Sequence, residues 1–203
     1  MKSIPDRPIL AEFRERSQRW AARAGCLFAL LASAPLVGAA TNTWSGAGGN
    51  NLWSNAGNWS ANPSATTDTH FFRGSGSFSA ITLDSSRTIG GILLGSPQTT
   101  ALTIANSANT LTLGAVGIDM SAAGADLILN LGNIALGASQ TWNVRSGRTL
   151  TVSGTITGAG KTMTKTGTGT LVLGGRNTHD GMIITAGTLR LWATLESFGI
   201  GKS

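Results

Sequence analysis

The chain has 203 residues, a formal net charge of +6 and a hydrophobic share of 41%. Residues 1–23 hold six basic and three acidic residues, so that the remaining chain carries nine basic against six acidic ones. These nine bases are scattered singly, whereas nucleic-acid binding requires a clustered basic stripe. Composition and charge therefore argue against a nucleic-acid partner.

The first segment, residues 1–40, has the layout of a secretory signal peptide. Its basic stretch is followed by an uncharged apolar run from Cys26 to Ala39, and small residues close the run. That order of regions is typical of signal peptides. The run has about 14 residues, too few for a bilayer that needs about 20. We therefore expect residues 1–40 to be removed on export; the alternative is an amphipathic cytosolic helix.

Cysteine and histidine are too few for a disulfide or metal framework. Cys26 is the single cysteine and lies within the predicted signal peptide. The chain that follows therefore offers no disulfide and no thiolate metal ligand. Its two histidines, His70 and His179, cannot form a closed zinc site. We expect neither a metal nor a cofactor.

Residues 41–80 form a segment rich in tryptophan and glycine, which we predict to be an N-terminal capping region. Trp44, Trp53 and Trp59 lie in its first half. In a structure built of repeats the first unit has no preceding neighbour, and large aromatic side chains suit the task of covering it. Exposed indoles also stack on sugar rings, so these three tryptophans are candidate glycan contacts. We favour the capping role.

From residue 81 to residue 191 apolar and polar residues alternate in short pieces. Leu102-Thr103-Ile104 and Leu150-Thr151-Val152 are examples, and Gly, Asn or Ser separates most of these pieces. A period of two is typical of half-buried strands, and the separating residues favour turns. No stretch shows helical periodicity. The sequence therefore predicts an all-β chain.

The strand pattern also repeats along the chain. The phrase Thr-Leu-x-Leu/Val begins at Thr110, Thr149, Thr170 and Thr188, with gaps of 39, 21 and 18 residues, the longest of which divides into two steps near 20. Units of about 20 residues, too small to bury their own apolar face, predict a parallel β-solenoid of about six to eight coils. A β-sandwich is the alternative. We expect these positions in the core: Leu111, Leu150, Leu171 and Leu189.

Residues 163–191, with the sequence MTKTGTGTLVLGGRNTHDGMIITAGTLRL, resemble the autotransporter-associated β-strand repeat, also called the passenger-associated transport repeat. The resemblance implies a right-handed parallel β-helix in a secreted or surface-displayed bacterial protein, in which the repeat supports passenger secretion and folding. His179 and Asp180 stand where the family usually has an aromatic residue and Thr, so we expect an altered turn there. Residues 192–203 are expected to form a truncated or irregular tail.

The motifs for nucleotide binding and catalysis are incomplete. Gly158 to Thr162 resembles the end of a phosphate-binding loop, but position 155 is Thr where that motif needs Gly. Glycan hydrolysis needs a pair of carboxylates; Asp119 and Asp126 are better explained as solvated turn residues. His179-Asp180 lacks the G-x-S-x-G element of a serine hydrolase. We expect no nucleotide ligand and no enzymatic activity.

Together these patterns predict a non-enzymatic, secreted or surface-displayed β-helical protein of the passenger type, with a structural or adhesive role. Its expected partners are outer-membrane or extracellular surface components, or glycans. The first alternative is a carbohydrate-binding surface module that uses the tryptophans of residues 41–80. A polysaccharide-cleaving β-helix enzyme is the second and less favoured alternative, because a fold alone does not decide function.

Overall fold

The computed structural model describes residues 40–62, 66–73 and 78–192. The predicted signal peptide, apart from Ala40, and the predicted tail, apart from Trp192, lie outside the described residues. Within the three described segments there is no α-helix, only strands and one short 3-10 helix, η1 (Ala56–Asn58). No helix in these segments is long and apolar enough to cross a membrane.

Twelve strands make up the described chain and join in one hydrogen-bonded sheet. In chain order they are β1 (Thr41–Trp44), β2 (Thr69–Phe72), β3 (Ala80–Thr82), β4 (Arg87–Leu94), β5 (Leu102–Met120), β6 (Leu127–Leu136), β7 (Gln140–Val144), β8 (Thr149–Val152), β9 (Thr155–Thr166), β10 (Thr170–Leu173), β11 (Thr178–Ile184) and β12 (Thr188–Leu191).

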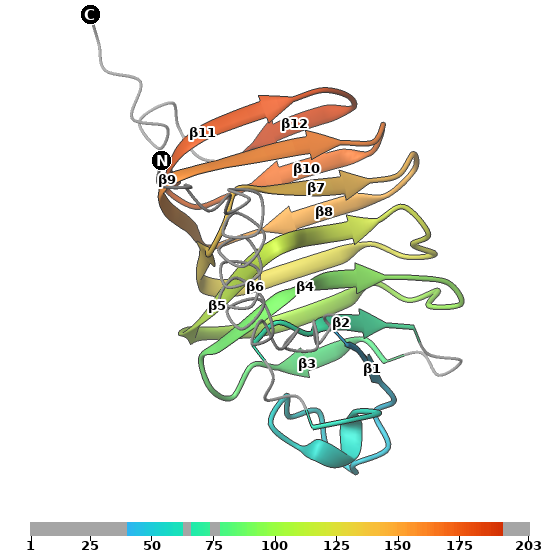
Figure 1. The fold of residues 1–203 in the computed structure, drawn as a ribbon. Coiled ribbons are helices and arrows are strands. Elements are labelled where there is room, and N and C mark those ends of the chain that lie inside the picture. The colour runs from blue at the N-terminus through green and yellow to red at the C-terminus, as the bar shows by residue number, and fades with distance from the viewer. Residues whose placement is uncertain (1–39, 63–65, 74–77, 193–203) are drawn as a thin grey trace, which may run out of the picture. The chain divides into compact units, whose positions relative to one another are not determined.

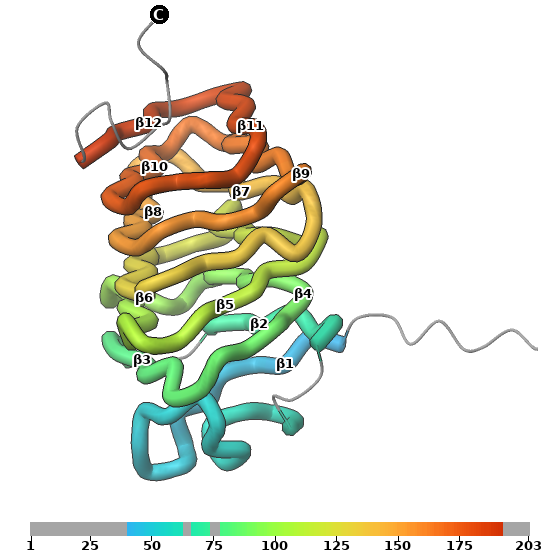
Figure 2. The backbone as a smooth tube through the Cα atoms, turned by 90° about the vertical axis from the view of Figure 1, so that its left-hand side faces the viewer, coloured from blue at the N-terminus to red at the C-terminus, as the bar shows by residue number. Residues whose placement is uncertain are grey.

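The strands wind into a coil whose successive turns lie on top of one another (Figures 1 and 2). All pairs of named strands are parallel, and they form three ladders. The first ladder runs β3–β5–β6–β8–β10–β12. The second runs β1–β2–β4–β5–β7–β9–β11. The third joins the first part of β4 to the middle of β5, the end of β6, and the beginnings of β9 and β11.

The predicted fold class, an all-β, right-handed parallel β-helix formed by a single chain, is confirmed. The number of coils is lower than the six to eight predicted. Partners along the first ladder are 23, 25, 23, 21 and 18 residues apart, so the solenoid has about five turns and most coils exceed 20 residues. The partners are Ile81, Ile104, Leu129, Val152, Leu173 and Leu191.

Three of the four Thr-Leu phrases align in one column. Thr170 pairs with Thr149 on one side and with Thr188 on the other, as the repeat predicted. The phrase at Thr110 does not join them, because it lies on the third ladder and pairs with Asn133. If every repeat of the phrase occupied the same place in its coil, all four would share a column; Thr110 does not, because the same alternation builds more than one face of the coil.

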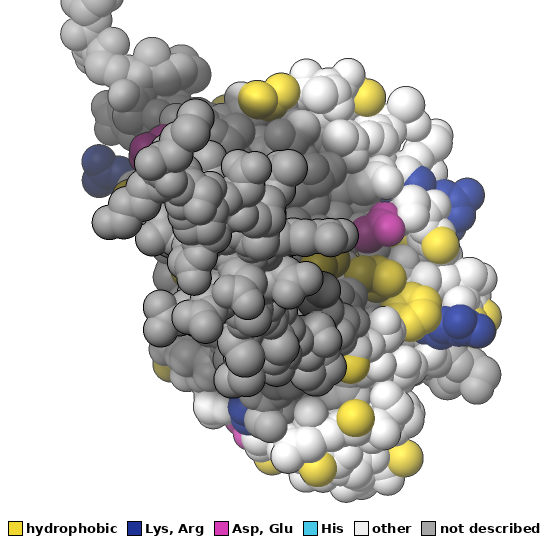
Figure 3. All heavy atoms as spheres, viewed as in Figure 1, with side chains coloured by type: hydrophobic (Ala, Val, Ile, Leu, Met, Phe, Trp, Pro, Cys, Tyr) yellow, Lys and Arg dark blue, Asp and Glu magenta, His cyan; other side chains and the backbone are white. Residues whose placement is uncertain are grey.

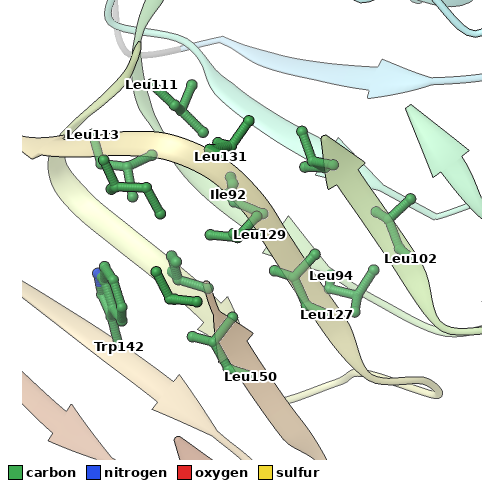
Figure 4. Close-up of a cluster of buried hydrophobic side chains, with 14 of the residues drawn as sticks. Ile92, Leu94, Leu102, Leu111, Leu113, Leu127, Leu129, Leu131, Trp142 and Leu150 are labelled. Atoms are coloured by element: carbon green, nitrogen blue, oxygen red, sulfur yellow. The ribbon is translucent and has the colours of Figure 1, made fainter. Parts of the chain in front are cut away.

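Each ladder stacks its inward side chains into a column that forms the core (Figure 4). One column of leucines passes through Leu102, Leu127 and Leu150, all fully buried. Three of the four predicted core leucines are 0% exposed: Leu111, Leu150 and Leu171. The fourth, Leu189, is only partly buried, because it lies on the last coil and no described strand stacks above it.

Charged side chains are scattered over the visible face of the solenoid. Figure 3 shows Lys, Arg and Asp side chains of the described residues standing singly or in small groups on the visible face, among hydrophobic side chains, uncharged side chains and backbone. The outward positions of the ladders explain this pattern, since threonine and asparagine alternate there with the buried leucines.

Candidate functional site

The predicted aromatic residues come together at the N-terminal end of the solenoid. Trp44 ends β1, and Trp53 and Trp59 lie in the loop that follows. The Trp59 ring centroid lies 4.9 Å from that of Trp44, edge to face, and 5.0 Å from that of Trp53. Phe72 of the next coil packs against all three indoles. We call Trp44, Trp53, Trp59, His70 and Phe72 the aromatic cap.

The loop after β1, which carries Trp53 and Trp59 of the cap, closes both strand edges of the first coil. Leu52 forms a parallel bridge with Thr82, so that the loop covers the free edge of β3. Trp44 forms an antiparallel bridge with Trp59, and the Ser60 amide donates to the Thr43 carbonyl at 2.9 Å, which covers the edge of β1. Backbone groups that would otherwise be an open template for pairing are therefore satisfied.

Side-chain amides hold the loop of the cap in shape. Asn58 is 0% exposed; its Nδ2 donates to the carbonyls of Asn50 at 2.9 Å and Leu52 at 3.0 Å, and its Oδ1 accepts from the Gly48 amide at 2.8 Å. Asn55 caps η1 by accepting from the Gly57 amide. The loop thus depends on hydrogen bonds from buried amides, which are costly to leave unpaired.

Asp84 ties the loop to the solenoid. Its carboxylate accepts from both the backbone amide and the hydroxyl of Ser54. Partial burial favours the neutral acid, but the hydrogen bonds from Ser54 outweigh it, so that the pKa of Asp84 is lowered. The charged form of Asp84 therefore stabilises the closed end.

His70 is the one titratable side chain of the aromatic cap. It is 0% exposed, and its ring centroid lies 4.8 Å from that of Trp59 and 5.2 Å from that of Trp53. Nδ1 lies 3.2 Å from the Asp68 carbonyl, whereas Nε2 has no partner within the described chain. Burial lowers the pKa of His70, against the opposing effect of Asp68. The cap therefore favours neutral imidazole.

The burial of the tryptophans bears directly on the two roles weighed for them. Trp44, Trp53 and Trp59 are 1%, 0% and 6% exposed. An indole that stacks on a sugar needs a ring face open to solvent, and these rings pack against one another instead. The geometry supports capping and gives no support to a glycan contact at these three residues.

The carboxylates along the solenoid bind backbone amides of nearby turns. Asp119 accepts from the Ser121 amide at 2.8 Å, and Asp126 accepts from the Thr149 amide at 2.9 Å, which links neighbouring coils. The described residues contain no group of three or more His, Cys, Asp or Glu side chains placed to hold a metal ion. These acids are thus engaged in the turns between strands.

The altered turn expected at His179-Asp180 is wrong: both residues lie within β11, where the pairing with β9 is irregular. Asp180 accepts from the Gly160 amide at 2.8 Å. The pairing register between β11 and β9 shifts between His179 and Gly181, which marks an irregularity where the residues differ from the family pattern. Burial lowers the pKa of His179, and Asp180 acts in the opposite direction.

Lys165 is a buried cation that the sequence did not reveal. It pairs with Trp142 on the preceding coil, in a core column, and is 0% exposed. Its Nζ donates to the carbonyls of Gly167 at 2.9 Å, Ala186 at 3.0 Å and Thr166 at 3.3 Å. Burial lowers the pKa of Lys165. The side chain joins the turn after β9 to the turn before β12, and so ties the last two coils together.

The passenger-associated-transport-repeat family model matches residues 163–191, which run from the end of β9 to the end of β12. The fold and this match define a class: a parallel β-solenoid whose last coils carry a passenger-associated transport repeat, as the resemblance predicted. No curated protein and no solved structure matches the chain.

Proposed function

We propose that the protein is an exported, surface-associated β-solenoid of the passenger type, with a structural or adhesive role and no catalytic activity. One observation carries the proposal: the matched repeat stacks in register on a continuous solenoid, as its last coils. A repeat of this family indicates an exported bacterial surface protein. Its stacking indicates that its side chains serve the packing of coils.

The chemistry of the described side chains supports a role without catalysis. The carboxylates of Asp84, Asp119, Asp126 and Asp180 each accept a backbone amide. Carboxylates that hold backbone amides in this way are less available as a general acid or base. The partners that this proposal favours are outer-membrane or extracellular surface components, or glycans.

Export is tested by expressing the full chain in a bacterial host and separating the cell fractions. We expect the product outside the cytoplasm, with an N-terminus created near Ala39 or Ala40. Leu30→Arg, which places a charge in the apolar run, serves as a matched variant that should keep the chain in the cytoplasm. An exported wild-type product that retains Met1 would contradict the predicted signal peptide, and a wholly cytoplasmic product would contradict the proposed location.

The two alternative functions have separate assays. Co-sedimentation with insoluble polysaccharides tests for a carbohydrate-binding module, and release of reducing sugar tests for a hydrolase. We expect no sugar release from any polysaccharide tested. Sustained release that disappears in Asp119→Asn or Asp126→Asn, at unchanged stability, would replace the present proposal with an enzymatic one.

A further inference from the structure

The last coil of the solenoid presents an open edge. Among the described strands, β12 pairs with β10 alone and β11 with β9 alone. Inward positions on these strands are accordingly exposed: Ile184 by 46% and Leu191 by 40%, against 0% and 1% for their partners one coil earlier, Lys165 and Leu173. The upper surface of the core is therefore uncovered by any described strand.

The backbone at this edge also has groups without a pairing strand among the described residues. Thr188 and Trp192 donate their amides to Gly169 and Leu173 of the preceding coil, at 3.1 and 3.0 Å. Because amides alternate in direction along a strand, Leu189 and Leu191 turn their N–H and C=O groups away from β10. In the same way, the Thr185 amide donates to the Lys165 carbonyl. The backbone N–H and C=O groups of the preceding residue, Ile184, therefore point along the solenoid axis, away from β9. Such groups form a template for another strand.

The ladders specify what this template accepts. The first ladder is parallel along its whole length and stacks leucine on leucine, from Leu150 through Leu171 to Leu189. A segment that continues it must be extended, must run parallel to β12 and must place apolar residues at alternate positions. Strand addition of this kind draws affinity from main-chain hydrogen bonds and specificity from alternate side chains.

We propose that the open edge of β11 and β12 binds an extended polypeptide segment with Leu-x-Leu alternation, which adds as a further parallel coil. Four of the six exposed large hydrophobic side chains in the described segments lie on this last coil, which such a segment would cover: Ile183, Ile184, Leu191 and Trp192. The inference deepens the proposed function and rests on it, because it names the kind of partner that the repeat coil binds.

A second copy of the chain fits this edge less well. Its N-terminal end is closed by the aromatic cap and by the bridges at Leu52 and Trp59, so it cannot add head to tail. Its own last coil could meet this one only with the strands antiparallel, whereas all ladder pairs of the solenoid are parallel. The geometry therefore favours a segment over a second copy.

The binding experiment uses the full chain and a labelled synthetic peptide with the sequence of residues 163–191, which contains the alternation. The control peptide carries Asn at the positions of Leu171, Leu173, Leu189 and Leu191. Fluorescence anisotropy should show binding of the first peptide at least about tenfold tighter than of the control. Equal binding of the two peptides, or binding of neither, would overturn the proposal.

Variants of the chain locate the binding. Leu191→Pro removes an edge N–H where proline is tolerated, and should weaken peptide binding at least about tenfold. Leu191→Val keeps that N–H and should bind nearly as well as the wild type. If the proline variant fails to fold by circular dichroism, Leu191→Asp provides the same test through charge at the edge. Undiminished binding by the folded edge variant would overturn the proposal.

The remaining outcomes separate the two proposals. A concentration-dependent dimer in sedimentation that excludes the peptide would show that the edge takes a second copy, and would overturn the inference. An exported chain that binds no peptide removes the edge proposal alone. A cytoplasmic chain that binds the peptide removes the proposed surface function, and leaves the strand-addition site in place.

Discussion

At the N-terminal end of the solenoid the inward residues of β1, Asn42 and Trp44, are each 1% exposed, whereas at the C-terminal end Ile184 and Leu191 are 46% and 40% exposed. Both ends face the same problem, since a terminal coil has a neighbour on one side only. A loop with buried indoles and bridging backbone closes the first end. Among the described residues nothing equivalent covers the second, although Lys165 ties its last two coils together from within. Among the described residues, the first coil of the solenoid is therefore closed, whereas no described strand covers the last one.

Removing an indole from each end tests this difference most strongly. Trp53→Ala should destabilise the fold by about 3–5 kcal/mol, because it empties the centre of the aromatic cap. Trp192→Ala, at a side chain 69% exposed, should change stability by about 0.5 kcal/mol or less. Urea unfolding of the two variants measures both values. Equal losses at the two ends would refute the asymmetry.

A pair of leucine variants extends the test to the columns. Leu150→Ala, in the middle of the leucine column, should cost about 2–5 kcal/mol through lost burial and a cavity. Leu191→Ala, on the open coil, should cost about 1 kcal/mol or less, because much of that side chain is already hydrated. Thermal unfolding provides the comparison. A Leu191 variant as unstable as the Leu150 variant would mean that the last coil is covered.

Lys165 is expected to stabilise the last coil through its ammonium group. Lys165→Met retains most of the volume but removes three donors from backbone carbonyls, so we expect a loss of about 1–3 kcal/mol. Lys161→Met, the same change on the same strand, should have little effect. Hydrogen exchange should show the loss as faster exchange near Ala186. Unchanged exchange near Ala186 would show that the Lys165 ammonium does not hold the last two coils together.

The histidine of the cap predicts a modest pH dependence. Because burial lowers the pKa of His70 below its ordinary 6.5, the folded state binds fewer protons than the unfolded state. Stability should therefore be full above about pH 6.5 and fall as the pH drops below it. Arg87 acts in the same direction and Asp68 opposes it. His70→Phe should flatten the curve measured by urea unfolding between pH 5 and 8 relative to the wild type.

His179 provides the control for that pH curve. Its pKa is also lowered by burial, but it lies on β11, at the open end. His179→Asn should leave most of the pH dependence of the cap in place. If His179→Asn flattened the curve and His70→Phe did not, the cap would be excluded as the source of the acid sensitivity.

Much of the fold could be read from local alternation. The columns through Thr149, Thr170 and Thr188 followed from the spacing of identical phrases. The same alternation misplaced Thr110, because all three faces of a coil need inward and outward residues in turn. A fixed spacing near 20 also gave too many coils, since the turns between ladders vary in length and the sequence does not show which loops are long.

The candidate site was only partly accessible from the sequence. Trp44, Trp53 and Trp59 marked the closed end by residue type, but burial depends on the path of the loop, which Asn58 and Asp84 determine from a distance. In the sequence, Lys165 is one of nine singly scattered basic residues. One signal could have found it: in the alternation Met163, Lys165, the lysine occupies an inward position.

Native-state hydrogen exchange along the chain compares the closed first coil with the last described coil in a single experiment. We expect slow exchange for the amides of the cap, such as those of Trp53 and Trp59, which donate to backbone carbonyls. We expect markedly faster exchange for the amides of Leu189 and Leu191, which point away from β10. Equal or greater protection of those two amides, with early exchange in the cap, would contradict this expectation.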